Sequence, residues 1–389
     1  MNAPAFAQPE RAARVLLVLG SLDGGGAERV AVTLLQRCDA REVDIHVGLL
    51  RTTGAYLESV DRLRVSGPKA RGTGLASALM APRDIAGMIS KVRPQVVMSF
   101  GMGVNLAVAQ ALPRGDRRPR WICREDSNTA AEIANLSGNP AARAIVTALT
   151  RKAHGAADCL LAVAGDLGAQ LTRETPGARV RVIHNPIDLA MIEPLALAPL
   201  TAAPDRPFIV AAGRLVRQKG FDLLIEAFAG AVRTAGMDLV ILGEGPLEAD
   251  LRRQAAALGV GGRVKFPGFQ ANPWAWFARA KLFALSSRWE GFGNVVAEAM
   301  ACGVTVLASD CDFGPREQVG HGVSGWLVAP GSSAALSEGM DTLLANPVLA
   351  AKLAASGRER AGAFDVDRIV APYTRLFRDL AFTGAAAAF

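Results

Sequence analysis

The sequence predicts an α/β protein of two domains, each built on a mostly parallel β-sheet, and three observations carry this prediction. The chain has 389 residues, a length that suits two domains of roughly 100–200 residues each. Short apolar runs alternate with longer helix-like patterns in both halves, as in βαβ units. Five prolines fall within residues 186–207, a density typical of a linker. We therefore expect domains at 1–190 and 208–364, a linker at 191–207, and a C-terminal helix at 365–389 that returns to the N-terminal domain.

The N-terminal half opens with an Ala- and Pro-rich segment, 1–13, which we expect to be a loose terminus. Polar residues interrupt it before the apolar core of a secretory signal forms. The apolar run 15–19 predicts the first strand, the glycine-rich residues 20–26 a loop, and residues 28–38 a helix. Further strands are expected at residues 43–49, 96–99, 121–123, 159–163 and 180–183.

The C-terminal half repeats this design. Strands are expected at residues 208–212, 238–242, 264–266, 281–285 and 305–308, and helices at 220–235, 246–258 and 294–302. Gly303 stands where the glycine that ends a helix belongs. From residue 333 the pattern is helical, with an amphipathic helix at 365–382 and a frayed tail after it. Two Rossmann-like halves joined in this way place a ligand-binding cleft between the domains.

Composition excludes several classes of protein. Half of the residues are hydrophobic and 20% are charged, which is typical of a folded, soluble chain, and no run reaches the roughly 18 apolar residues of a membrane span. The five cysteines show no CxxC spacing and none of the four histidines is paired at metal-ligand spacing. Neither a disulfide framework nor a protein-built metal centre is therefore expected, and the odd cysteine count favours the reducing cytoplasm.

The net charge of +7 is uneven along the chain. Residues 1–195 hold 24 Lys and Arg against 18 Asp and Glu, and the remainder holds 19 against 18. A solvated basic face is one interpretation, and attraction to an anionic membrane or a pyrophosphate-bearing acceptor is the other. With 6% aromatic residues and none interleaved with the arginines, nucleic acid is not expected as a partner. The basic clusters are Arg62, Arg64, Lys69 and Arg71, and Arg114, Arg117, Arg118 and Arg120.

The clearest chemical signal lies where a strand is expected to lead through a glycine-containing turn into a helix. The free main-chain N–H groups of Gly293, Asn294 and Val295 would form the positive end of that helix, which suits a phosphate. Glu290 lies in the turn and Glu298 one turn inside the helix, so both carboxylates can face the cleft and accept sugar hydroxyls. Two ordinary surface glutamates beside a helix end are the alternative.

Two cations follow the first strand of the C-terminal half. Arg214 comes after the strand, and Lys219 precedes Gly220 and a helix. Cations beside a helix N-terminus would neutralise a pyrophosphate, although a solvated loop with unrelated charges has the same pattern. In the N-terminal half, the glycines at 24–26 permit a backbone to approach a ligand closely, or merely mark a turn. They are not a dinucleotide fingerprint, because Leu22 stands where that motif needs glycine.

Together these motifs resemble family 4 retaining glycosyltransferases, which have the two-domain GT-B architecture. The resemblance covers essentially the whole chain. The E-x7-E spacing is moderately specific alone and highly specific in this order with Arg214 and Lys219. The matching blocks lie at residues 24–29, 184–188, 213–220, 243–246, 290–298, 314–317 and 322–328.

The resemblance implies a nucleotide-sugar donor, expected to be a UDP-sugar, and no metal or cofactor. Arg214 and Lys219 would bind the diphosphate, Glu290 the donor sugar and Glu298 the ribose. Arg214, Lys219 and Glu290 would be the catalytic residues, with no protein nucleophile, because the acceptor attacks on the face that the donor leaves. The remaining donor-site residues implied are Gly25, Gly26, Glu244, Gly291, Phe292, Gly293, Asn294 and Val295.

The sequence departs from the family in the N-terminal domain, where many members have a histidine after a central strand. Arg124 stands in that stretch, as in a subgroup that builds polysaccharides and lipid-linked oligosaccharides. Arg124, Asn105 and Asn128 are thus expected sugar or acceptor contacts, or else polar residues that cap helices. We expect transfer of a hexose or N-acetylhexosamine to a cell-surface polysaccharide or lipid-linked saccharide, in the cytoplasm, with peripheral attachment to the inner face of the membrane left open.

Three alternatives remain at this stage. The acceptor could be a soluble small molecule or a glucan, since the donor motifs would be the same. The protein could bind sugar nucleotides without catalysis. A nicotinamide-dependent oxidoreductase would need a glycine fingerprint followed by an acidic residue about 20 positions on, which neither half supplies.

Overall fold

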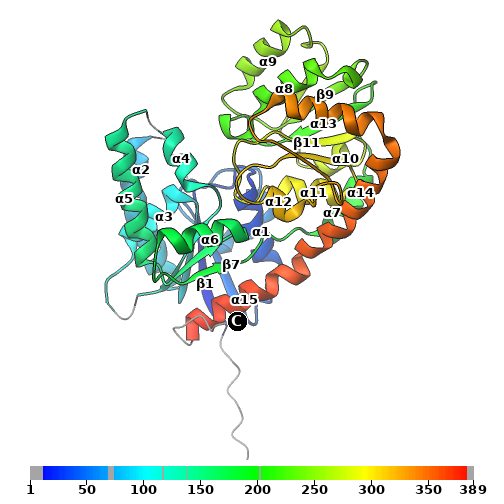
Figure 1. Ribbon diagram of the computed structural model, residues 1–389. Coiled ribbons are helices and arrows are strands. Elements are labelled where there is room, and N and C mark those ends of the chain that lie inside the picture. Colours follow the sequence, from blue (N-terminus) through cyan, green and yellow to red (C-terminus); the bar gives the residue numbers. More distant parts are fainter. Residues whose placement is uncertain (1–11, 69–73, 116–117, 137, 201–202, 383–389) are drawn as a thin grey trace, which may run out of the picture.

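The computed structural model describes residues 12–68, 74–115, 118–136, 138–200 and 203–382. It contains two parallel sheets, one in each half of the chain (Figure 1). The first has the strand order β3-β2-β1-β4-β5-β6-β7 and the second β10-β9-β8-β11-β12-β13. The predicted α/β fold with two Rossmann-like sheets is therefore confirmed. The tail expected after residue 382 lies outside the described residues.

The strands of the N-terminal sheet are mostly continuous apolar runs because helices cover both of its faces. These strands are β1 (Ala13–Leu19), β2 (Val43–Leu49), β3 (Val65–Ser66), β4 (Val96–Phe100), β5 (Arg120–Glu125), β6 (Cys159–Ala162) and β7 (Val180–Val182). The helices are α1 (Gly26–Arg37), α2 (Leu75–Val92), α3 (Met102–Ala111), α4 (Thr129–Leu136), α5 (Pro140–Ala156) and α6 (Gly165–Glu174), with 3₁₀ turns at Leu57–Ser59 and Arg62–Arg64.

The C-terminal sheet follows the same plan. Its strands are β8 (Phe208–Ala212), β9 (Asp238–Leu242), β10 (Val264–Gly268), β11 (Leu282–Leu285), β12 (Val306–Ser309) and β13 (Trp326–Val328). Its helices are α8 (Phe221–Gly230), α9 (Glu248–Ala257), α10 (Trp274–Phe277), α11 (Asn294–Ala301), α12 (Pro315–Gln318), α13 (Ser333–Ala345) and α14 (Pro347–Ala361). The helix expected at 220–235 stops at Gly230 and is followed by the 3₁₀ turn Val232–Thr234, whose first amides donate to Asp341.

Part of the expected linker is helical. Helix α7 (Leu189–Leu197) occupies its first part, capped by Asp188, whose Oδ1 accepts from the Met191 amide at 3.1 Å. The helix packs against α10 and α11 of the second domain. Arg279 fixes the end of α7 with a hydrogen bond of 3.1 Å to the carbonyl oxygen of Ala196. Capping and docking therefore prevail over the proline content, and residues 191–197 are part of the packed structure.

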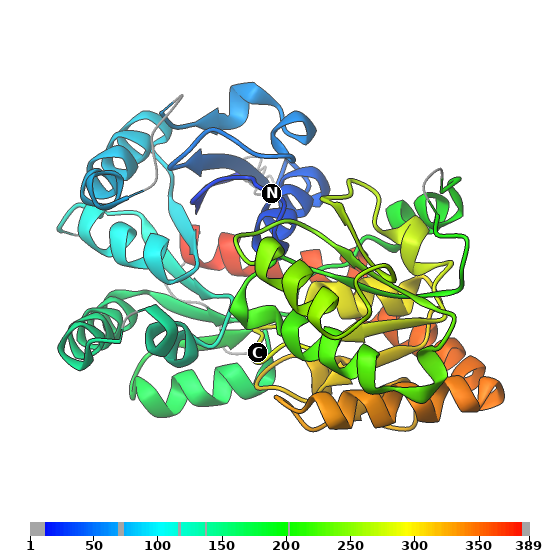
Figure 2. The same cartoon turned by 90° about the horizontal axis from the view of Figure 1, so that it is seen from above.

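Helix α15 (Val366–Phe382) crosses back from the C-terminal half to the N-terminal sheet, where it contacts β1 and α1 (Figure 2). Alternate residues of β1 point to opposite faces of that sheet. Leu17 packs in the cluster formed with α1 and α15, whereas Leu16 packs on the other face in a cluster that continues into the second domain. The two domains thus share buried apolar surface, and the chain passes between them at both residues 187 and 365, which pair as a β-bridge.

Candidate functional site

Two helix N-termini, one from each domain, meet after the central strands of the two sheets. Helix α1 begins at Gly26, after β1, and α11 begins at Asn294, after β11. The Asn294 Nδ2 atom donates to the Gly26 carbonyl oxygen at 3.2 Å. The main-chain N–H groups of Asn294 and Val295 make no hydrogen bond with any residue that the structure describes. The positive ends of two helix dipoles therefore converge, which favours a bound anion.

The glycine-rich loop brings the N-terminal domain into contact with the C-terminal one. Gly24 has a φ of +106°, and a Cβ placed there would lie 2.7 Å from the Phe269 ring of the other domain. Gly25 is the residue that caps α1, and the Glu28 carboxylate folds back over it. Burial raises the pKa of Glu28. The loop thus lies on one wall of the junction, as the glycine pattern predicts for a close backbone approach.

Glu290 and Lys219 form an ion pair in this junction. The Lys219 Nζ atom lies 2.6 Å from Glu290 Oε1, and the Ser287 hydroxyl donates to the same oxygen at 2.6 Å. Glu290 is 4% exposed. No described residue makes a hydrogen bond to its Oε2, so that oxygen remains able to accept a hydrogen bond. The sequence assigned Lys219 to phosphate and Glu290 to sugar, and the structure brings the two side chains together.

Glu298 lies deeper in α11 and is 3% exposed. The Trp274 indole Nε1 donates to its Oε2 at 3.2 Å. Its Oε1 lies 3.6 Å from Nη1 of Arg29, a residue of the opposite domain. A buried carboxylate is stable only with such partners. Neither Trp274 nor Arg29 was among the predicted site residues.

Arg214 and Glu244 lie on the rim of the junction, where both are exposed. The Arg214 guanidinium makes no hydrogen bond or ion pair with the residues that the structure describes. Its charge acts on Glu28 across the domain boundary and opposes the rise in the pKa that burial causes. Glu244 Oε1 accepts from the Phe269 amide at 3.4 Å. Arg214 is thus an exposed cation beside the meeting helix ends, as expected for a phosphate ligand.

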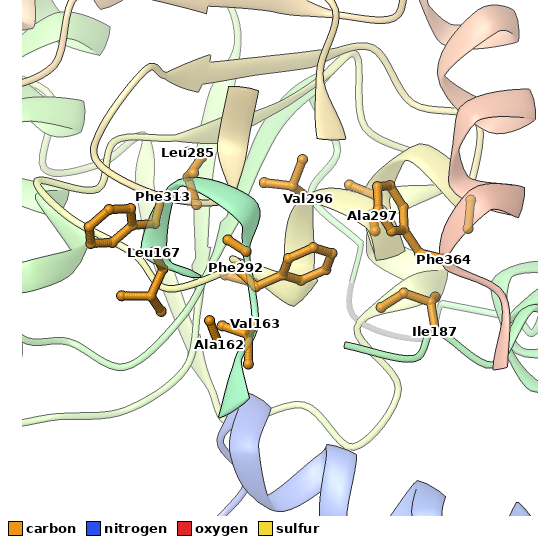
Figure 3. Packing of buried hydrophobic residues seen from close by; sticks show 14 of the residues in the cluster. Ala162, Val163, Leu167, Ile187, Leu285, Phe292, Val296, Ala297, Phe313 and Phe364 are labelled. Carbon is orange, nitrogen blue, oxygen red and sulfur yellow. The ribbon is translucent and has the colours of Figure 1, made fainter. Parts of the chain in front are cut away.

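The turn between Glu290 and α11 is built into the contact between the domains. A Cβ on Gly291 would lie 1.8 Å from the Asp126 carbonyl oxygen, so only glycine permits this approach. Gly293 takes the left-handed conformation that starts α11. Phe292 is 1% exposed and packs against Phe364, with ring centroids 5.3 Å apart (Figure 3). The Phe292 ring is therefore part of the hydrophobic core, and only the main chain of this residue can reach a nucleotide-sugar.

The three candidate acceptor contacts are buried, and each makes hydrogen bonds within the protein. Arg124 is fully buried and donates to Asn185 Oδ1 at 2.6 Å. Asn105, 2% exposed, donates to Glu125 Oε1 at 2.8 Å. Asn128 caps α4 by accepting from the Ala131 amide at 3.0 Å. The capping alternative is thus correct for Asn128, and the assignment of Arg124 and Asn105 to sugar or acceptor stays a prediction.

A polar chain that the sequence did not indicate links the buried arginine to the meeting helix ends. Arg124 donates to Asn185, whose Nδ2 donates to Asn294 Oδ1 at 2.6 Å. Asn294 in turn donates to the Gly26 carbonyl. These residues are far apart in sequence, so no spacing rule could have joined them. The network fixes the orientation of the Asn294 side chain and thereby of the first turn of α11.

One group of side chains in the described part of the chain has the spacing of metal ligands. Cys123, Glu125 and His154 place one ligand atom each within 4.8 Å of the others, and all three are buried. His154 Nε2 lies 2.9 Å from Glu125 Oε1. Burial raises the pKa of the Cys123 thiol well above its usual range. The group already satisfies its hydrogen bonds within the N-terminal domain, and it includes none of the residues at the junction.

Comparison with known proteins establishes the class. Residues 24–191 match the family model described as Glycosyltransferase Family 4, and residues 196–360 match the one described as Glycosyl transferases group 1. With two parallel sheets and the junction between them, these matches define a two-domain glycosyltransferase. The chain belongs to family 4 of the glycosyltransferases, as the motifs indicated.

Among its relatives is the N-acetylgalactosamine-N,N'-diacetylbacillosaminyl-diphospho-undecaprenol 4-alpha-N-acetylgalactosaminyltransferase of Campylobacter jejuni, 35% identical over 49% of this chain and 51% of that protein. The lipopolysaccharide core biosynthesis glycosyltransferase LpsE of Rhizobium meliloti is 33% identical over 51% of this chain and 57% of its own. The chain therefore spans about half the length of these curated relatives.

Solved structures share the fold over nearly the whole chain. Sucrose-phosphate synthase from Thermosynechococcus elongatus is 21% identical, with a TM-score of 0.77 over 96% of this chain and all of that one. HepE of Anabaena in complex with UDP and glucose is also 21% identical, with a TM-score of 0.71 over 93% of this chain and 98% of that one. WaaG, a glycosyltransferase involved in lipopolysaccharide biosynthesis, has a TM-score of 0.75 at 17% identity, over 95% and 99% of the two chains. These similarities establish the GT-B fold.

Proposed function

We propose that the junction between the domains binds a UDP-sugar and that the protein transfers its hexose or N-acetylhexosamine, with retention of configuration, to a lipid-linked or cell-surface saccharide. The observation that carries the proposal is the meeting of the α1 and α11 N-termini beside an exposed arginine and a lysine–glutamate pair. Two helix dipoles and two cations form a site for a diphosphate. Two buried carboxylates beside it suit the hydroxyls of a sugar and a ribose.

The reaction needs stabilisation of the charge that develops on the departing nucleoside diphosphate. The bond between the anomeric carbon and the diphosphate oxygen breaks, and its electron pair stays with the diphosphate. The acceptor hydroxyl oxygen bonds to the same carbon on the same face, and its proton passes to the departing diphosphate. Lys219, Arg214 and the helix ends stabilise that charge, so we propose that the transfer needs no metal. Glu290 Oε2 would accept a hydroxyl of the donor sugar.

The proposed donor and acceptor draw support from the comparisons. HepE was solved with UDP and glucose, and the name of the Campylobacter relative specifies a diphospho-undecaprenol acceptor. A screen of UDP-, GDP- and ADP-sugars for thermal stabilisation and for donor hydrolysis, with and without EDTA, tests the proposal. We expect a UDP-sugar to stabilise the protein and to be hydrolysed with EDTA present. Selective stabilisation by a GDP- or ADP-sugar, or turnover lost in EDTA, would contradict it, and binding without hydrolysis or transfer would favour a non-catalytic binder.

A lipid-linked acceptor would require the protein to work at a membrane surface. The described helices include none long and apolar enough to cross a membrane. Helices α2, α4 and α5, at the outer end of the N-terminal domain (Figure 1), expose apolar side chains next to exposed cations, as membrane-surface helices do. The apolar ones are Leu79, Met80, Leu136, Ile145 and Leu149, and the cations Arg83, Lys91, Arg151 and Lys152.

This surface differs from the basic clusters that the sequence indicated. Arg64 pairs with Asp44, and Arg118 and Arg120 both pair with Asp158, so part of that charge is neutralised. Lys69, Arg71 and Arg117 lie outside the described residues.

Sedimentation with anionic and with neutral vesicles separates the acceptor classes. We expect binding to anionic vesicles only, lost on Ile145→Glu and retained on Val348→Glu, a matched change at an 82% exposed valine of α14. No binding at low salt would favour a soluble or glucan acceptor.

A further inference from the structure

Arg29 places its guanidinium across the boundary between the two domains. Its Nε and Nη2 atoms donate to the Tyr56 hydroxyl at 3.1 and 2.5 Å, which leaves Nη1 directed at Glu298 Oε1, 3.6 Å away. Its Cζ atom lies 5.3 Å from the centroid of the Tyr56 ring and 4.8 Å from that of the Trp274 ring. The cation is therefore held between two aromatic rings and faces one carboxylate.

These partners come from both halves of the protein. Tyr56 belongs to the N-terminal domain, as Arg29 does, whereas Trp274 begins α10 and Glu298 lies within α11 of the other domain. Burial lowers the pKa of Arg29, but Glu298 and Tyr56 raise it by more, so the guanidinium stays charged. The Glu298 carboxylate is thus held at one oxygen by its own domain, through Trp274, and at the other by the opposite domain.

We propose that Arg29 is a positioning residue that orients Glu298 toward the ribose of the donor and makes this contact depend on the approach of the two domains. The inference rests on the proposed function, in which Glu298 accepts the ribose hydroxyls. Arg29 acts through Glu298. Its loss should therefore weaken recognition of the nucleoside and leave recognition of the diphosphate to Arg214 and Lys219.

The geometry calls for a guanidinium rather than any cation. Two of its nitrogens are occupied by Tyr56 while the third faces Glu298. Lysine keeps the charge but offers a single nitrogen on a flexible chain, which cannot hold both partners in this arrangement. Tyr56 fixes the direction of the fork, so removal of its hydroxyl should weaken the same function with the Arg29 charge in place.

The experiment compares full-length wild type with Arg29→Lys, Tyr56→Phe, Glu298→Gln and the Arg29→Lys/Glu298→Gln double variant. Arg41→Ala is the control, because Arg41 belongs to the same domain and its side chain is 89% exposed. Calorimetric titration with UDP and with inorganic pyrophosphate separates nucleoside from diphosphate recognition. The KM for the donor sugar and kcat are measured on the same proteins.

Arg29→Lys should weaken UDP binding by about 10- to 100-fold, the range of a charge-assisted contact. It should raise the donor KM more than it lowers kcat and leave pyrophosphate binding unchanged. Tyr56→Phe should act in the same direction by less, and Arg29→Lys should add little in the Glu298→Gln background.

Two results would overturn the inference and can be told apart. If wild type binds UDP and both Arg29→Lys and Tyr56→Phe bind it equally well, Arg29 does not position Glu298, and the proposed function stands. A loss of UDP and pyrophosphate binding to the same extent would likewise contradict a role through Glu298. If wild type itself binds no nucleoside diphosphate, the proposed function fails and this inference fails with it.

Discussion

Replacement of Lys219 with methionine removes a charge at the centre of the site and keeps the length of the side chain. Lys219 Nζ lies 2.6 Å from Glu290 Oε1, and the two side chains are 18% and 5% exposed. The substitution therefore leaves a buried carboxylate with one remaining donor, the Ser287 hydroxyl. It also removes one of the two cations assigned to the diphosphate. Stability and catalysis should both fall, for different reasons.

The structure sets the size of each effect. Removal of one partner from a buried ion pair destabilises a protein by about 3–5 kcal/mol, and the partial exposure of Lys219 together with the retained Ser287 bond places this case at about 2–3 kcal/mol. For a domain of this size that corresponds to a loss of about 5–10 °C in Tm. Loss of a preorganised charge that stabilises the transition state lowers kcat by about 10²–10³-fold.

Thermal melts and donor turnover measured on Lys219→Met, Glu290→Gln and the double variant separate the two effects. The double variant has no unpaired charge, so its Tm should return toward that of wild type while its activity stays low. Lys352→Met, an exposed lysine of α14, is the matched control. If Lys219→Met keeps wild-type kcat/KM, or if the double variant recovers activity along with stability, the assignment of Lys219 to the diphosphate is wrong.

Two further substitutions test the contacts between the domains. Gly291→Ala places a methyl group 1.8 Å from the Asp126 carbonyl oxygen, so the domains must separate. We expect at least about a tenfold loss of kcat/KM and a larger radius of gyration by X-ray scattering. An unchanged radius with full activity would contradict this expectation. Burial raises the pKa of Glu317, but hydrogen bonds from His184 and the first amides of α6 lower it by more, so the pKa lies below the ordinary value of a glutamate. The stability from Glu317 is therefore present above the ordinary pKa of a glutamate and is lost as the pH falls through the lower pKa of the folded state. Melts from about pH 5 to pH 3 should show a steeper loss of Tm for wild type than for Glu317→Gln; equal slopes would rule out this role.

Much of the fold could be predicted because its strands are locally distinctive. The runs at 43–49, 208–212 and 238–242 are β2, β8 and β9 with the expected bounds. β8 and most of β9 are continuous apolar segments, as expected of strands covered on both faces, whereas the first half of β2 alternates apolar and polar residues. The helix within the expected linker could not be predicted with equal success. Proline content indicated a linker at 191–207 and gave no sign of α7. The Asp188 cap of that helix is local, whereas its contact with Arg279 depends on tertiary structure.

Some residues of the candidate site could likewise be predicted from the sequence, and others could not. Glu290 and Lys219 could be placed together because both follow parallel strands of one sheet, whose carboxyl ends share an edge. The role of a polar residue on a buried strand could not be predicted locally. Arg124 is committed to Asn185, 61 residues away, and Phe292 to Phe364. Arg29 lies in the matching block at 24–29 but was assigned no role, because its partner Glu298 belongs to the other domain.

The central claim is that the residues at the meeting point of α1 and α11 bind the nucleotide-sugar donor. Calorimetric titration of wild type, Lys219→Met and Glu298→Ala with UDP and with the UDP-sugar selected in the donor screen tests it most directly. We predict saturable binding to wild type, a marked loss in Lys219→Met, and loss of nucleoside recognition in Glu298→Ala with the fold retained. Wild-type affinity in both variants, or no binding of any nucleotide-sugar to the wild-type protein, would contradict the claim.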